Sequence, residues 1–177
     1  MKYVLLLRGI NVGGKNKVSM PELKDKISNV GYENVISYIN SGNIIFDTTD
    51  GIDTVNQSIS KILNTYPFKI NKVILSRSEY LEELENLPSW WFNDSYRKDV
   101  LFYTNEIDYS FMRARIEQMP LLDEAVHFGK NAVFWGKYNE NSYLKTSYHK
   151  YLIKESFYKS VTIRNSRTFE KIADLLK

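Results

Sequence analysis

The feature that most constrains the fold of this sequence is an order of short β-prone runs and helical segments that occurs twice. In the first half, four β-prone runs and two helical segments alternate, at residues 3–8, 20–30, 35–39, 44–46, 53–63 and 70–75. The two middle runs are joined by residues 40–43 (NSGN), and Gly and Asn tolerate the positive φ of a hairpin turn. The order is therefore β-α-β-β-α-β.

The second half has the same order of elements. Strands are predicted at residues 100–103, 124–128, 132–135 and 160–163, with a hairpin at 129–131. Helices are predicted at 108–118 and at 143–155, the latter because Leu144, Tyr148, Tyr151 and Leu152 recur at i, i+4, i+7 and i+8. A linking helix at 78–87 precedes this half, and a C-terminal helix begins near Ser166.

This order predicts an α+β chain of two tandem ferredoxin-like units, each with an antiparallel sheet of strand order 4-1-3-2. We expect unit 1 at residues 1–77, a helical and aromatic connector at 78–98, and unit 2 with the C-terminal helix at 99–177. Two helices cover only one face of a sheet, yet the first strand is apolar on both faces. We therefore expect the units to pack into one globule in which neither half folds alone.

The amino-acid composition excludes several classes of catalysis and binding. The chain has no Cys, which excludes disulfides and thiolate catalysis, and its two His residues have no metal-ligand spacing, so we expect no metal and no cofactor. No apolar run has the length of a membrane span or of a signal segment, so we expect a cytoplasmic protein without membrane association.

The net charge of +3 permits binding to phosphate or nucleic acid. Homo-oligomerisation is left open by the sequence.

The segment of residues 8–17 (RGINVGGKNK) is the most suggestive candidate site. Residues 9–15 fit the G-x-x-x-x-G-K part of a phosphate loop, but Asn16 replaces the hydroxyl residue and the helix signal begins later, at Ser19. This departure argues against nucleotide hydrolysis. Flexible Gly backbone flanked by basic side chains can still present N–H groups and charge to an anion.

The predicted strand order places another segment of the chain beside this loop. In a 4-1-3-2 sheet, the end of the first strand lies at the same end of the sheet as the hairpin at residues 40–43. A second basic segment, residues 164–167 (RNSR), precedes the last helix, where an anion can also bind. The candidate ligand-binding residues are Arg8, Asn11, Gly13, Gly14, Lys15, Ser41, Asn43, Arg164 and Arg167.

Three interpretations of function follow from these residues. The first is a binding protein for an anionic or phosphorylated ligand, a nucleotide or a nucleic-acid phosphate, at the Gly-rich loop. The second is a small cofactor-independent enzyme that uses the Arg, Asn and Ser cluster, although no acid or base is identified in the sequence. The third is binding of single-stranded nucleic acid on the unit 2 sheet, through Phe102, Tyr103, Phe134 and Trp135.

Three motifs carry a resemblance to a known family. The sequences RGINVGG at residues 8–14, SGN at 41–43 and RN-x-R-T at 164–168 resemble those of a widespread bacterial family, a domain of unknown function. The resemblance extends over essentially the whole chain and implies a fold of paired α-β plaits. It implies no reaction, substrate or catalytic residue.

Overall fold

The chain divides into two compact units. The computed structural model describes residues 1–104 and 106–177. One unit comprises Met1–Leu81 together with Ile172–Lys177, and the other comprises Glu82–Lys171. The last six residues of the chain therefore belong to the first unit.

The first unit contains a four-stranded antiparallel sheet. Its strands are β1 (Lys2–Arg8), β2 (Glu33–Tyr38), β3 (Asn43–Asp47) and β4 (Asn71–Ser76). They lie in the order β2-β3-β1-β4, with β1 hydrogen-bonded between β3 and β4. This order is the one predicted for a ferredoxin-like unit.

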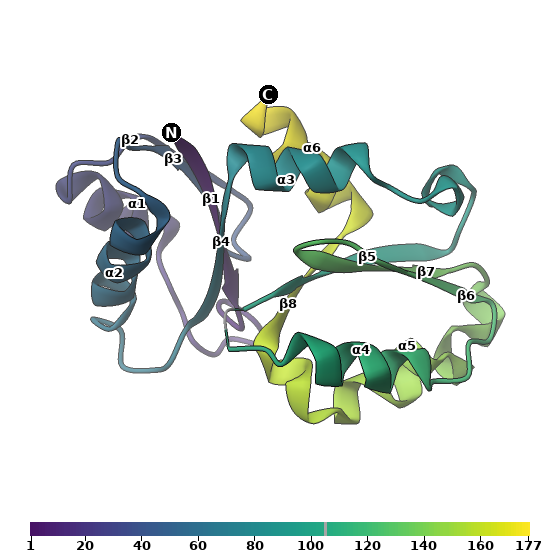
Figure 1. Cartoon of the computed structure of the whole chain (residues 1–177). Coiled ribbons are helices and arrows are strands. Elements are labelled where there is room, and N and C mark those ends of the chain that lie inside the picture. The colour runs from purple at the N-terminus through teal and green to yellow at the C-terminus, as the bar shows by residue number, and fades with distance from the viewer. Residues whose placement is uncertain (105) are drawn as a thin grey trace. The chain divides into compact units, whose positions relative to one another are not determined.

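Two helices cover one face of this sheet, α1 (Met20–Asn29) and α2 (Ile52–Leu63), as Figure 1 shows. Leu5 and Leu7 pack in the core under these helices, with Phe46 from β3. Val4 and Leu6 point to the opposite face and are also fully buried. The two-sided burial of β1 expected from its continuous apolar run is confirmed.

The second unit has the same topology. Its strands are β5 (Arg97–Tyr103), β6 (Glu124–Phe128), β7 (Ala132–Lys137) and β8 (Val161–Asn165), in the order β6-β7-β5-β8. Helices α4 (Tyr109–Glu117) and α5 (Ser147–Lys150) lie along one face of the sheet (Figure 1). The α+β class and the two tandem ferredoxin-like units are thus confirmed.

Aromatic side chains cover the other face of the second sheet. Trp91, in the 3-10 helix Ser89–Phe92, contacts Phe134 and Phe169 edge-on, at ring-centroid distances of 5.5 and 5.9 Å. Its indole N–H donates to Glu170 at 3.1 Å. Phe169 and Glu170 belong to the C-terminal helix α6 (Ser166–Leu176), and the linking helix is α3 (Arg77–Glu85). Both helices were predicted.

The continuous helix predicted at residues 143–155 is wrong. This segment is broken into Glu140–Lys145 (3-10), α5, Leu152–Lys154 (3-10) and Ser156–Ser160 (3-10). Thr146 has extended backbone and its hydroxyl accepts from the N–H of His149, so it starts a new helix. The apolar spacing was misleading, because Leu144 and Tyr151 are 65% and 43% exposed.

Gly42 offers a test of the β2-β3 hairpin. Its φ is +86°, and a Cβ added there would lie 2.7 Å from Cβ of Leu7 and 2.9 Å from Cδ1 of Ile10. We predict that Gly42→Ala lowers the free energy of unfolding by about 2–4 kcal/mol, since it adds a core clash to the backbone strain. Urea denaturation measures this loss.

The matched control is Gly13→Ala, where φ is +59° and nothing lies within 4 Å of the added Cβ. The loss of unfolding free energy in Gly13→Ala reflects backbone strain alone, about 1 kcal/mol. Equal losses in the two variants would contradict the close approach of Gly42 to β1.

Candidate functional site

The Gly-rich loop between β1 and α1 forms a small hairpin of its own. Gly13 and Gly14 have φ values of +59° and +74°, as a type I′ turn requires. The Lys15 N–H donates to the Val12 carbonyl at 3.1 Å and closes the turn. The two glycines are therefore needed for the conformation of the loop. The loop is an ordered turn and not a phosphate loop that runs directly into a helix.

Asn11 connects three segments of the first unit. Its side-chain amide donates to the carbonyls of Val18 at 3.0 Å and Asn40 at 2.8 Å, and its Oδ1 accepts from the Val18 N–H at 2.9 Å. The expected proximity of the Gly-rich loop to the β2-β3 hairpin is therefore confirmed. Both polar atoms of Asn11 bond to protein, so this residue positions the loop.

Asn43 has a similar positioning role in the hairpin. It is 1% exposed, and its amide donates to the Tyr38 carbonyl at 3.0 Å and to the Ser41 hydroxyl at 3.1 Å. Asn43 and Ser41 hold the turn that carries Gly42. Asn43 and Ser41 are thus joined to each other, whereas Asn11 bonds to the backbone of Val18 and Asn40.

An open depression of about 550 Å³ lies where this loop meets the start of α1. Its lining consists of Asn11, Gly14, Lys17, Val18, Ser19, Met20, Pro21 and Asn40. Ser19 caps α1, because its hydroxyl accepts from the N–H of Glu22. Lys17 is the one titratable side chain among these lining residues, which include no carboxylate and no imidazole.

The other basic candidates of the first unit, Arg8 and Lys15, are not among the residues that line this depression. Lys15 is exposed on the loop, and Arg8 is half-buried at the end of β1, opposite Asn71 of β4. Gly13 lies at the tip of the turn. Lys17 lies within the candidate segment at residues 8–17, whereas the sequence prediction missed Ser19 as a lining residue, although its capping signal marked the start of the helix.

Arg164 and Arg167 belong to the other compact unit. Arg164 is 6% exposed, and its Nη1 donates to the Thr162 hydroxyl and to the Ile163 carbonyl, both at 2.9 Å. Arg167 is exposed, and the start of α6 is capped by Asn165, which accepts from the N–H of Thr168 at 2.9 Å. Arg164 is thus engaged in hydrogen bonds within its own unit.

Three of the four rings considered as an aromatic platform on the second sheet are buried, and the fourth, Tyr103, is half-buried and packs against Tyr109. Phe102, Phe134 and Trp135 have exposures of 0%, 1% and 0%. Phe134 packs against Trp91 and Phe169, and Trp135 packs against Tyr148. These rings cannot stack on bases in this structure, so the interpretation based on them loses its physical basis.

The second unit contains a buried ionic cluster that sequence analysis missed. The carboxylate of Asp99 bonds to the ammonium of Lys137, and both side chains are completely buried. Arg97 donates to the same carboxylate oxygen at 3.0 Å. Burial lowers the pKa of Lys137 to about 8, although the charge of Asp99 opposes this shift.

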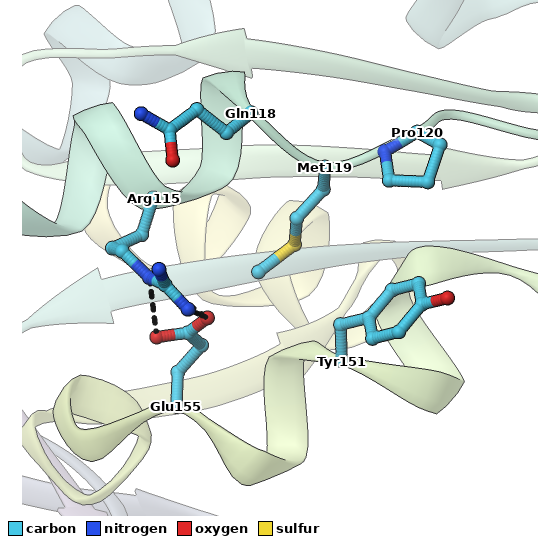
Figure 2. A pocket seen from close by; sticks show the side chains of 6 residues that line it. All are labelled: Arg115, Gln118, Met119, Pro120, Tyr151 and Glu155. Atoms are coloured by element: carbon cyan, nitrogen blue, oxygen red, sulfur yellow. Dashed lines mark hydrogen bonds and ion pairs between the residues drawn. The ribbon is translucent and has the colours of Figure 1, made fainter.

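A small pocket of about 220 Å³ also lies in the second unit. Figure 2 shows the ion pair of Arg115 and Glu155 beside Tyr151 and the apolar side chains of Met119 and Pro120. The Arg115 guanidinium donates to both Glu155 oxygens, with distances of 2.8 to 3.1 Å. Because the two charges neutralise each other, this pocket has no net charge with which to select a ligand.

The described residues form neither a membrane-spanning helix nor a metal-binding cluster. Within residues 1–104 and 106–177, no helix is long and apolar enough to cross a membrane. The same part of the chain has no group of three or more His, Asp or Glu side chains that could hold a metal ion.

Two antiparallel sheets with the same strand order, one carrying a Gly-rich loop, define an α+β protein of tandem ferredoxin-like units. The chain belongs to the family described as protein of unknown function (DUF1697), whose model matches residues 1–134. A solved structure, that of the conserved bacterial protein SP0830 from Streptococcus pneumoniae, is 50% identical with a TM-score of 0.95. The match covers 99% of this chain and 98% of that one. No curated protein matches the chain.

These comparisons confirm the family expected from the motifs, a bacterial family of unknown function. They also confirm that both units of this chain have counterparts in one solved protein. They assign no ligand and no reaction, so the function must be argued from the geometry.

The positioning role of Asn11 can be tested by removing its amide. We predict that Asn11→Gly lowers the free energy of unfolding by about 2–3 kcal/mol, since three hydrogen bonds are lost while φ of +54° remains allowed. Asn16→Gly is the control, because Asn16 has φ of +51° but makes one exposed bond, to the Gly9 carbonyl. Chemical denaturation that shows equal losses would contradict the connection made by Asn11.

The ionic cluster predicts a pH dependence of stability. The pKa of Lys137 is about 8 in the folded chain and 10.5 ordinarily, so between these values the unfolded chain binds more protons. The contribution of Lys137 to the free energy of unfolding should therefore rise with pH through this window, by at most about 1.4 kcal/mol per pH unit.

The measurement is the difference in unfolding free energy between wild type and Lys137→Met at pH values from 7 to 10. We expect the wild-type value minus the Lys137→Met value to increase with pH through this window. A difference that is constant or falls for Lys137→Met would show that its ammonium is not disfavoured by burial.

Proposed function

We propose that this chain is a binding protein for a small anionic ligand that bears phosphate, held in the depression at the start of α1. The observation that carries the proposal is the lining of that depression, in which a lysine is present and acidic side chains are absent. A concave surface with one sign of charge concentrates the oppositely charged ligand.

Three groups in the depression suit an anion. The ammonium of Lys17 supplies a full charge, and Lys17 is exposed. The Ser19 hydroxyl accepts from the Glu22 N–H and still has its own proton to donate to a ligand. The start of α1 adds the positive end of a ten-residue helix.

Gly14 favours ligand binding because it has no side chain to block the backbone. Nothing lies within 4 Å of the position of an added Cβ, so the backbone there is open to close approach by a ligand. Asn11 and Asn40 form part of the wall of the depression, and the Asn11 amide donates a hydrogen bond to the Asn40 carbonyl. The wall is therefore in place before a ligand arrives, which lowers the entropic cost of binding.

The same lining disfavours acid–base catalysis in the depression. General acid–base chemistry needs a group that gains or loses a proton near neutral pH within hydrogen-bond reach of the substrate. Lys17 is the one titratable group among the lining residues. We therefore prefer binding to catalysis as the role of this site, and we propose a cytoplasmic location, where phosphorylated metabolites are abundant.

Isothermal titration with inorganic phosphate, pyrophosphate and nucleoside mono- and triphosphates tests the proposal. We predict that at least one of these binds, and that Lys17→Ala weakens its binding about tenfold or more, since a charge-assisted contact contributes about 1.5–3 kcal/mol. Lys154→Ala, which removes an exposed lysine in the other unit, is the matched control.

The proposal fails if none of these phosphates binds. It also fails if Lys17→Ala and Lys154→Ala have the same effect, because binding would then reflect overall charge and not the depression.

A further inference from the structure

The second unit has a surface that combines a concave pocket with exposed apolar side chains. It is formed by α4 and by the segment of residues 147–157, which lie side by side. Arg115 of α4 pairs with Glu155 at 2.8 Å, and the rings of Phe111 and Phe157 lie 6.5 Å apart. We call this the α4 surface.

The pocket in the α4 surface has the size of a site for one side chain. Its volume of about 220 Å³ is below the range of roughly 300–1,000 Å³ that is typical of small-molecule sites. Met119, Pro120 and Tyr151 give it apolar walls, and Figure 2 shows Met119 pointing between Glu155 and Tyr151. The thioether of Met119 and the guanidinium of Arg115 are groups that contact aromatic rings favourably. The pocket therefore suits an aromatic side chain.

Exposed apolar side chains lie around this pocket. Phe111 precedes Arg115 by one helical turn, so the two side chains are on the same face of α4. Phe111, Leu121, Tyr151 and Ile153 are 45%, 48%, 43% and 59% exposed. Aromatic, Met and Arg side chains are enriched at protein interfaces, and clustered exposed apolar side chains mark interaction sites.

The carboxylates of the α4 surface are already engaged within the protein. Residues 108–118 and 147–157 contain three of them. Glu117 pairs with Arg113 at 2.9 Å, and Glu155 pairs with Arg115. The side chain of Asp108 caps the start of α4. These carboxylates therefore leave no uncompensated negative charge on the surface.

The charges that remain available on the α4 surface are positive. Lys150 and Lys154 are exposed, and within residues 1–104 and 106–177 neither pairs with a carboxylate. In the chain they directly adjoin the exposed Tyr151 and Ile153. A partner that carries carboxylates next to an aromatic side chain complements both the charge and the pocket.

We propose that the α4 surface binds a short acidic segment of a partner protein, with an aromatic side chain of that segment in the pocket. Carboxylates that flank this aromatic side chain face Lys150 and Lys154. The depression at the start of α1 belongs to the other compact unit, so this inference is independent of the proposed function.

The arrangement of side chains on α4 favours a peptide over an anionic membrane. Attachment to a membrane surface uses a continuous apolar helix face with Trp, Phe or Leu. Along α4 and its C-cap, Arg115 and Gln118 lie between Phe111 and Met119, so the apolar face is interrupted. A protruding side chain fills a pocket, whereas the smooth surface of a bilayer does not.

Selection of a phage-displayed library of random 12-residue peptides on the immobilised chain tests the inference. We expect the enriched sequences to contain an aromatic residue flanked by Asp or Glu. The enriched peptides are then synthesised with a fluorescent label, and their binding is measured by anisotropy. Tyr151→Ala should weaken binding about tenfold, as truncation of an interface Tyr commonly does. Lys154→Glu should weaken it about tenfold at low salt and less at high salt.

Two control variants match these changes. Phe92→Ala removes an aromatic side chain of the same unit that is 75% exposed, and Lys61→Glu reverses the charge of an exposed lysine in the other unit. Neither should change peptide binding. Lys154 is exposed, so Lys154→Glu tests the surface without disturbing the core.

Four results would overturn the inference. The first is a selection that enriches no peptide, or peptides without an aromatic residue next to carboxylates. The second is a loss of binding in Phe92→Ala as large as that in Tyr151→Ala. The third is tighter binding to vesicles of anionic phospholipid than to the peptides, with the same dependence on Lys154. The fourth is a dimer in sedimentation experiments that Tyr151→Ala abolishes, because the surface would then bind a second copy of the chain.

Discussion

The amide of Asn11 determines the shape of the candidate site. This one side chain joins the loop after β1 to the residue before α1 and to the β2-β3 hairpin. Each of these segments contributes a wall of the depression. Without the amide, the loop would lose its hydrogen bond to the Asn40 carbonyl, and Lys17 would lose a constraint on its position relative to Asn40. The chemistry of the site therefore depends on a residue that we do not expect to contact the ligand.

The two units share a topology but differ in the connection that creates the site. In the first unit the connection from β1 to α1 spans residues 9–19, whereas in the second the connection from β5 to α4 spans only 104–108. The longer connection leaves room for a turn, a depression and exposed cations. In the second unit the corresponding sheet instead buries its charges, as Asp99 and Lys137 show. The repeated fold thus provides one unit with exposed lysines on a long loop and the other with an internal ion pair.

Much of the fold could be predicted from local signals. The hairpin at residues 40–43, the cap at Ser19 and the two-sided apolar β1 all depend on neighbours in sequence, and all were predicted. The helix at 143–155 failed because a capping threonine and exposed apolar side chains outweigh a regular spacing. The position of the basic loop beside the hairpin was predicted from the strand order alone. The buried pair of Asp99 and Lys137 could not be predicted, since each resembles an ordinary exposed charge at a strand end until the register places them together.

The central claim is that an anion binds in the depression at the start of α1. Its most direct test is a titration of the ¹⁵N-labelled chain with pyrophosphate, followed through the backbone amide resonances. The account predicts saturable shifts at Gly14, Lys17, Ser19 and Asn40, with little change in the second unit. Shifts centred on the Arg115 pocket, or small unsaturable shifts at exposed lysines throughout the chain, would contradict it.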